Sequence, residues 1–189
     1  MKDKILTDEY GFELYEENEF PQAYLLTFRT FGTWLHGDRR DSVARDGRNH
    51  YGRPRIPPNP SLETSLRNEA RQHPFELSKD MRRCVELAIK DFCRRKEHLL
   101  HAVTARSNHV HSVISARRKP ERLTDALKAI ATRKLREEGL VDPSVIIWSR
   151  GRSRRYLWKP KNVANAIDYV LYCQSEVPFE IWQDDDFRQ

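Results

Sequence analysis

Two histidines one position apart, His109 and His111, stand in the stretch RSNHVHSVISA that spans residues 106–116. The hydrophobic residues around them are typical of a β-strand. Because side chains alternate along a strand, both imidazoles should point to the same face, about 6.6 Å apart, and could share one metal ion. The alternative is that they are ordinary surface or core residues. His101 adds a third imidazole on the preceding strand, in a register that the sequence leaves open.

Two other histidine chemistries do not fit the spacing. Histidine-triad hydrolases need a third histidine at the next alternate position, where this chain has Val113. Two-histidine phosphodiesterases need a second copy of a His-x-Thr motif, which the sequence lacks. Neither pattern accounts for His109 and His111.

The stretch HLLHAVTARSNHVHSVI, residues 98–114, resembles the metal-binding hairpin of the single-tyrosine HUH transposases, especially the branch of REP-associated tyrosine transposases. In that branch a pattern H-A-φ-φ-φ-M-P-N-H-φ-H carries the ligands, where φ is a hydrophobic residue. Arg106 and Ser107 replace the usual Met-Pro pair. The matching residues are His101, Ala102, Asn108, His109 and His111. The resemblance extends from about residue 24 to residue 174.

The resemblance implies an enzyme that cuts single-stranded DNA with a tyrosine, which becomes linked to the 5′ phosphate and lies on the last helix. The family pattern A-I-D-Y-φ aligns with residues 166–170 and makes Tyr169 the nucleophile. A helical wheel gives the same choice, because Tyr169 lies on the flank of one stripe of the helix whereas Tyr172 points almost directly away from it. The stripe consists of Val163, Ile167, Val170 and Gln174.

The resemblance also implies a divalent metal as cofactor, Mg²⁺ or Mn²⁺, held by His109 and His111. Two imidazoles favour Mn²⁺ for tight binding. In relatives a Gln, Asn or Glu one turn after the tyrosine completes the site, whereas Cys173 stands there in this chain, followed by Gln174. We expect Gln174 to serve as the third ligand through a small helix distortion or π-bulge; the alternative is that Cys173 alters the metal preference.

The charge of the chain favours nucleic acid as a partner. The 189 residues include 34 Lys and Arg against 28 Asp and Glu, which gives a net charge of +6. The stretch SRGRSRRYLWKPK, residues 149–161, mixes basic and aromatic residues, a combination that suits single-stranded DNA. The candidate DNA contacts are Arg150, Arg152, Arg154, Arg155, Lys159, Lys161 and Trp158. The alternative is a charged hairpin in which Trp158 belongs to the core.

The chain length fits one domain. We expect a flexible arm at 1–20, with at most one helical turn, the HUH domain at 21–177 and an acidic tail at 178–189. An Arg- and Pro-rich insertion at about 33–77 is either a disordered or a functional loop. Its arginines are Arg39, Arg40, Arg45, Arg48, Arg53 and Arg55.

Three widely spaced cysteines without a CxxC pair argue against disulfides and zinc knuckles and fit a reducing cytoplasm, where the protein would be nucleoid-associated. No stretch approaches the roughly 20 apolar residues of a membrane span, so we expect no membrane partner.

The hydrophobic periodicity predicts the order β, α, β, β, α, β(β), α, which is the split β-α-β arrangement of an α+β, ferredoxin-like domain with an antiparallel sheet and helices on one face. Ser78 should cap the first helix, Ser107-Asn108 should join a hairpin, and Gly139 should end the second helix. The expected strands are 22–32, 98–106 and 109–116. The expected helices are 79–97, about 123–135 and about 160–175. Residues 144–158 should form a strand, a Gly-containing turn and a second strand.

These features lead to one principal hypothesis, a transposase-type enzyme that nicks and rejoins single-stranded DNA through a 5′-phosphotyrosine intermediate. One alternative is a domesticated protein that binds single-stranded or hairpin DNA without cleaving it. A metal-dependent phosphodiesterase acting on RNA or nucleotides is a third option. The sequence leaves open whether the protein is a monomer or a homodimer.

Overall fold

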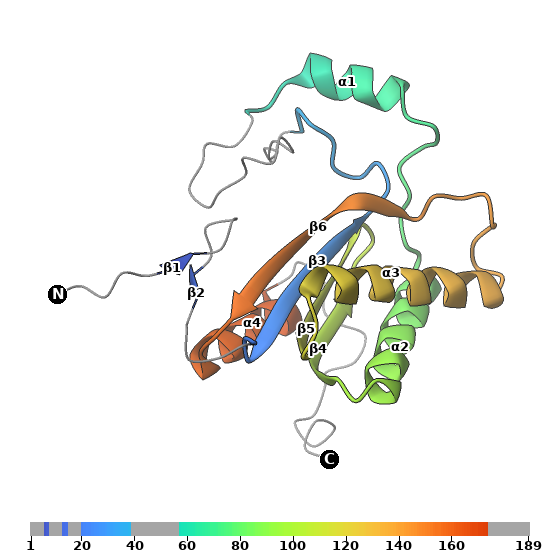
Figure 1. Ribbon diagram of the computed structural model, residues 1–189. Coiled ribbons are helices and arrows are strands. Elements are labelled where there is room, and N and C mark those ends of the chain that lie inside the picture. The colour runs from blue at the N-terminus through green and yellow to red at the C-terminus, as the bar shows by residue number, and fades with distance from the viewer. Residues whose placement is uncertain (1–5, 8–12, 15–19, 39–56, 174–189) are drawn as a thin grey trace.

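A four-stranded antiparallel sheet forms the centre of the protein, in a computed structural model that describes residues 6–7, 13–14, 20–38 and 57–173 (Figure 1). The strand order is β4-β5-β3-β6, and the fold is α+β. A separate pair of two-residue strands, β1 and β2, lies in the N-terminal arm. The strands are β1 (Leu6–Thr7), β2 (Glu13–Leu14), β3 (Ala23–Thr30), β4 (Leu99–Ala105), β5 (His109–Ser115) and β6 (Trp148–Leu157).

The topology confirms the predicted ferredoxin-like arrangement. β3 and β4 flank β5, and each pairs with it in the antiparallel sense, so the β3-α2-β4 unit is split by a third strand. β6 pairs antiparallel with the other edge of β3. The helices of the described chain are α1 (Pro60–Asn68), α2 (Lys79–Arg95), α3 (Pro120–Glu137) and α4 (Pro160–Tyr172).

The helices cover both faces of the sheet, which corrects the expectation of helices on one face. The α2 and α3 helices pack on the face to which β3 turns Tyr24, Leu26 and Phe28. The α4 helix packs on the opposite face, against β4 and β5 (Figure 1). The physical reason is that the central strands carry apolar residues on both faces, and such a sheet is stable only when both faces are covered.

Two hydrophobic clusters result from this layering. The larger one lies between the sheet and α2 and α3, and Leu127 of α3 is fully buried in it. The smaller one lies under α4, where Val113 of β5 contacts a group that includes Val170. The smaller cluster fixes how α4 is rotated about its own axis.

Local signals position the elements as expected. The side chain of Ser78 accepts a hydrogen bond from the backbone N–H of Met81 and so caps α2. Residues 106–108 connect β4 to β5, and the backbone N–H of Arg106 donates to the carbonyl of His109, so Ser107 and Asn108 form the turn between them. Gly139 follows α3 with φ +66°, a left-handed conformation that glycine adopts without strain.

β6 is one continuous strand, so the prediction of a strand, a turn and a second strand over 144–158 was wrong. Gly151 lies within β6 and not in a turn, at the point where the pairing with β3 shifts between Phe28 and Thr30. A glycine inside a strand commonly marks such an irregularity. The basic stretch is therefore a strand of the main sheet.

The insertion contains a helix that the sequence reading did not predict. The carboxamide of Asn59 caps α1 by accepting from the N–H of Leu62, and no residue of α1 is buried. Gly37 has φ +89°, a left-handed conformation, and its backbone lies against the Asn59 carbonyl oxygen so closely that a Cβ at this position would clash. The six arginines at positions 39–55 and the tail at 178–189 lie outside the described residues. Within the described ranges, no helix is long and apolar enough to cross a membrane.

Leu127→Ala should lower the free energy of unfolding by about 2–5 kcal/mol, because it removes a fully buried side chain from the larger cluster and leaves a cavity. Leu87→Ala on α2 is the matched control: this leucine is largely exposed, and its loss should change stability by no more than about 0.5 kcal/mol. Urea denaturation of the two variants measures the difference, and equal losses would contradict the described packing of α3.

Candidate active site

His109 and His111 lie on the face of β5 that is turned toward α4. Their ring centroids are 4.6 Å apart and the ring planes are inclined by 76°. His111 is buried, whereas His109 at the start of the strand is half-buried. The alternation of the strand therefore places two imidazoles side by side.

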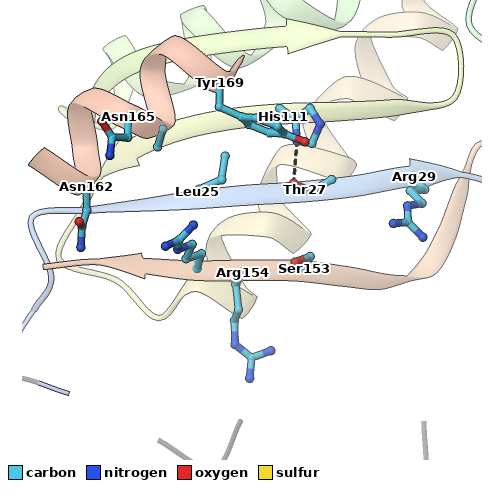
Figure 2. A pocket seen from close by; sticks show the side chains of 11 residues that line it. Leu25, Thr27, Arg29, His111, Ser153, Arg154, Asn162, Asn165 and Tyr169 are labelled. Atoms are coloured by element: carbon cyan, nitrogen blue, oxygen red, sulfur yellow. Dashed lines mark hydrogen bonds between the residues drawn. The ribbon is translucent and has the colours of Figure 1, made fainter. Parts of the chain in front are cut away.

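A hydrogen bond orients each ring. His109 Nδ1 lies 2.5 Å from Asn108 Oδ1, and His111 Nδ1 lies 2.7 Å from the hydroxyl oxygen of Thr27 on β3 (Figure 2). An amide oxygen only accepts, so His109 Nδ1 donates and the lone pair of that ring is on Nε2. The Thr27 hydroxyl can accept from His111 in the same way. Histidines that bind metals commonly donate their second ring nitrogen to such an oxygen.

Tyr169 of α4 lies over this pair. Its ring centroid is 5.4 Å from that of His111, with the planes inclined by 73°, and Figure 2 shows its side chain reaching down from the helix to the imidazole. Tyr169 is 42% exposed, and Tyr172 is 61% exposed. Of the two tyrosines on α4, the structure brings Tyr169 to the histidines.

Burial keeps His111 neutral. Loss of hydration lowers the pKa of His111 to about 3, and the nearby His109, Arg106 and Arg29 act in the same direction. At neutral pH this imidazole carries a lone pair and no charge. It is a suitable metal ligand and a very weak base.

A cleft of about 450 Å³ adjoins the histidines and the tyrosine. Arg29 enters it from β3, and its guanidinium carbon lies 3.3 Å from the ring centroid of Trp34. The sequence-based candidates did not include several polar residues that line the cleft, among them Thr27, Arg29, Asn162 and Asn165. Two sequence signals could have identified them. Side chains alternate along β3, so Thr27 and Arg29 share a face with Leu25. On α4, Asn162 and Asn165 are at helical spacing from Tyr169 and so lie on the same side.

The basic residues of β6 are divided between the two faces of the sheet. Arg155 lines the cleft. Arg152 lies on the α3 side, where its Nη1 is 2.5 Å from a carboxylate oxygen of Asp125. Arg154 also borders the cleft, but its Nε is 2.8 Å from Glu121 of α3 and its side chain points away from α4 (Figure 2). Arg155 is thus the arginine of this strand that is directed to the site.

The remaining candidate DNA contacts differ in their exposure to solvent. Arg150, Lys159 and Lys161 are exposed. Trp158 is only 8% exposed and stacks on Tyr156, with ring centroids 6.2 Å apart and planes inclined by 9°. Trp158 therefore belongs to the interior, as in the alternative considered for it.

The structure separates His101 from the other two imidazoles. A β-bulge between Leu100 and Ala102 shifts the register of β4, and His101 Nε2 lies 2.7 Å from Ser115 Oγ. It lines a second, separate cleft with Gln22. The third imidazole of the sequence motif does not join the site.

The third position of a metal site is not filled by the described residues. Among them, no group of three His, Cys, Asp or Glu side chains could hold a metal ion. Cys173 is exposed at the end of α4 and does not complete the pair of histidines. Gln174 lies outside the described residues. The two imidazoles, each oriented through Nδ1, nevertheless fit a metal that accepts nitrogen ligands.

Among the solved structures similar to this protein is a REP-associated tyrosine transposase bound to a REP hairpin. It is 12% identical to this protein over 84% of this chain and 70% of that chain, with a TM-score of 0.42. The sequence matches no protein-family model and no curated protein. The likeness is distant.

The metal-free protein should lose stability as the pH falls below about 6.5. In the unfolded chain His111 binds a proton near pH 6.5, but in the folded protein only near pH 3. The unfolded state therefore binds more protons in this range, and stability falls by up to about 1.4 kcal/mol per pH unit. Replacing His111 by glutamine removes this contribution, so urea denaturation in the presence of a chelator should show a shallower acid loss. Identical slopes for the two proteins would contradict the buried, neutral state of His111.

Proposed function

We propose that the protein nicks single-stranded or hairpin DNA with Tyr169 as the nucleophile. The phenolic oxygen attacks a backbone phosphorus, the bond from phosphorus to the 3′ oxygen breaks, and a 5′-phosphotyrosine link forms. The departing 3′ oxygen takes up a proton. Attack by a 3′ hydroxyl on the link reverses these steps and rejoins a strand. The observation that carries the proposal is the placement of Tyr169 against the two histidines, 5.4 Å from His111 between ring centroids.

The histidines serve as ligands in this proposal. His111 has a pKa of about 3, so it is too weak a base to remove the tyrosine proton at neutral pH. With both Nδ1 atoms directed to oxygens, His109 and His111 can present Nε2 to a divalent metal, Mg²⁺ or Mn²⁺. We propose Gln174, which follows Cys173, as the third ligand. A bound divalent ion supplies positive charge that polarises the phosphate under attack.

The proposed metal ion and the guanidinium of Arg29 would both help the phenol of Tyr169 to react. A phenol with a pKa near 10 costs about 4 kcal/mol to ionise at pH 7. Arg29 lines the cleft and is paired with His109 across the β3-β5 ladder. A guanidinium there stabilises the negative charge of the phosphate in the transition state and shares in offsetting this cost.

The size and charge of the cleft favour a single strand over a duplex. Its volume of about 450 Å³ is typical of a small-molecule site and is suited to one nucleotide. Arg29 and Arg155 supply the charge that backbone phosphates require. The strand can then pass along β6 toward the exposed Lys159 and Lys161.

Tyr169→Phe should abolish a covalent protein–DNA adduct, because it removes the attacking oxygen and keeps the ring. Tyr172→Phe is the matched control on the same helix and should retain the adduct, since Tyr172 is directed to solvent. The measurement is gel electrophoresis under denaturing conditions after incubation with labelled hairpin and single-stranded DNA and Mn²⁺.

An adduct that persists in Tyr169→Phe would assign the nucleophile elsewhere. Removal of divalent ions with a chelator should also prevent the adduct, and so should replacing both histidines. An adduct that forms equally well without a divalent ion would contradict the proposed role of His109 and His111.

A second candidate function is DNA binding without cleavage. The observation that favours it is that, within the described residues, no His, Cys, Asp or Glu side chain stands beside the two histidines as a third metal ligand. This protein would bind single-stranded or hairpin DNA tightly and in a salt-dependent way, with no need for a metal. Binding without any adduct under the conditions above would select this function.

Arg155→Ala should weaken binding of single-stranded DNA and lower the slope of log K against log salt by about 0.7, because one phosphate contact is lost. Arg152→Ala changes the net charge by the same amount but lies on the opposite face beside Asp125, so its affinity and slope should remain close to those of the unmodified protein. Fluorescence anisotropy at several salt concentrations measures both. Equal effects of the two substitutions would mean that net charge, and not the face of β6, determines binding.

A further inference from the structure

The end of the cleft farthest along α4 from Tyr169 is lined by two asparagines. Asn162 and Asn165 precede Tyr169 by seven and four residues, which is about two turns and one turn of helix, so all three lie on the same side of α4. Figure 2 shows both carboxamides directed toward the strands below the helix. Both residues line the same cleft as His111.

The side chains of these residues have no hydrogen-bond partner among the described residues. Neither the Asn162 nor the Asn165 side chain forms a hydrogen bond in the part of the chain that the structure describes, and Arg155 forms no ion pair there. Asn59 and Asn108 differ, because their carboxamides cap α1 and orient His109. The cleft therefore presents two carboxamides and one guanidinium with unused hydrogen-bonding capacity.

Helix propensity does not account for Asn165. Asparagine is less favourable than alanine inside a helix by up to about 0.7 kcal/mol, since its side chain competes for backbone hydrogen bonds. Asn165 lies inside α4, whereas Asn162 is in the first turn, and neither residue caps the helix through its side chain. The sequence thus keeps a poor helix former at a position that faces the cleft.

The chemistry of these groups matches one nucleotide. A carboxamide donates and accepts at once and pairs with two atoms of an adenine edge, the N6 amino group and N7. A guanidinium binds phosphate oxygens through parallel hydrogen bonds. Leu25 and Ala166 add an apolar surface beside these polar groups. A cleft of about 450 Å³ holds a single unstacked nucleotide of this kind.

We propose that this part of the cleft is a base-reading subsite, in which Asn162 and Asn165 hydrogen-bond to the edge of one unpaired base near the cleaved phosphate, with adenine preferred, and Arg155 binds the phosphate of that nucleotide. The proposal rests on the proposed function, because it assigns the subsite to the strand that Tyr169 cuts. It gives the site a sequence preference at one defined position.

The test is selection from a library of single-stranded DNA with randomised positions, in which the enrichment of each base at each position is measured. One readout is covalent adduct formation with the unmodified protein, and the other is binding to the Tyr169→Phe variant. We expect adenine to be enriched at one position. The Asn162→Ala/Asn165→Ala double variant should reduce that enrichment by about tenfold and keep or slightly raise thermal stability. Asn68→Ala, an exposed asparagine at the end of α1, should leave the enrichment unchanged.

The two readouts separate failure of the subsite from failure of nicking. If no adduct forms with any library member, nicking is overturned, and binding to Tyr169→Phe still measures the base preference. An enrichment that the double variant retains, or no enrichment at any position in the binding readout, would overturn the subsite. Enrichment of another base would overturn the assignment to adenine.

Discussion

The alternation of side chains along two central strands, β3 and β5, is the constraint on which the site depends. On both strands every second residue faces the larger core, and the residues between them lie on the side of the sheet that carries α4 and the cleft. On β3 this sends Phe28 into the core and its neighbours Thr27 and Arg29 to the cleft. A shift of one residue would bury Arg29 and expose Phe28, which hydrophobic burial opposes strongly. The core therefore determines which polar groups surround His111.

The same burial positions the tyrosine. Val170 is fully buried in the cluster under α4, and a neighbouring helix residue must lie about 100° away around the axis. Tyr169 is thereby held at the edge of the contact, where its ring meets His111 while remaining partly exposed. An attacking group must satisfy both conditions, because it has to approach the histidines and also reach a substrate. Thr27 and Asn108 complete the arrangement by fixing the two imidazole rings.

Periodicity in the sequence was sufficient to predict the ferredoxin-like order of elements, the shared face of the two histidines and the fact that Tyr169, and not Tyr172, lies on the side of the last helix that approaches them. These geometric features follow from local spacing, whereas the expectation of a nucleophilic tyrosine on that helix came from the family resemblance. Gly151 was misread because a glycine in a bulged strand has the same local signature as one in a turn, and only pairing with β3 distinguishes them. His101 was ambiguous for a similar reason, since a bulge next to it changes the face of the strand. Register and sheet coverage are non-local, so they could not be obtained from one sequence.

The placement of charge matters more to the proposed function than its sum. A net charge of +6 attracts nucleic acid without direction. In β6, however, Arg152 and Arg154 lie beside Asp125 and Glu121 of α3, which neutralise them, whereas Arg155 remains positive on the cleft side. Among these three arginines, the α3 helix thus leaves uncompensated the one on the face that carries the histidines and Tyr169. A phosphate drawn to this part of β6 meets the charge of Arg155 beside the group proposed to attack it, so the acids of α3 contribute to the orientation of DNA from the opposite side of the sheet.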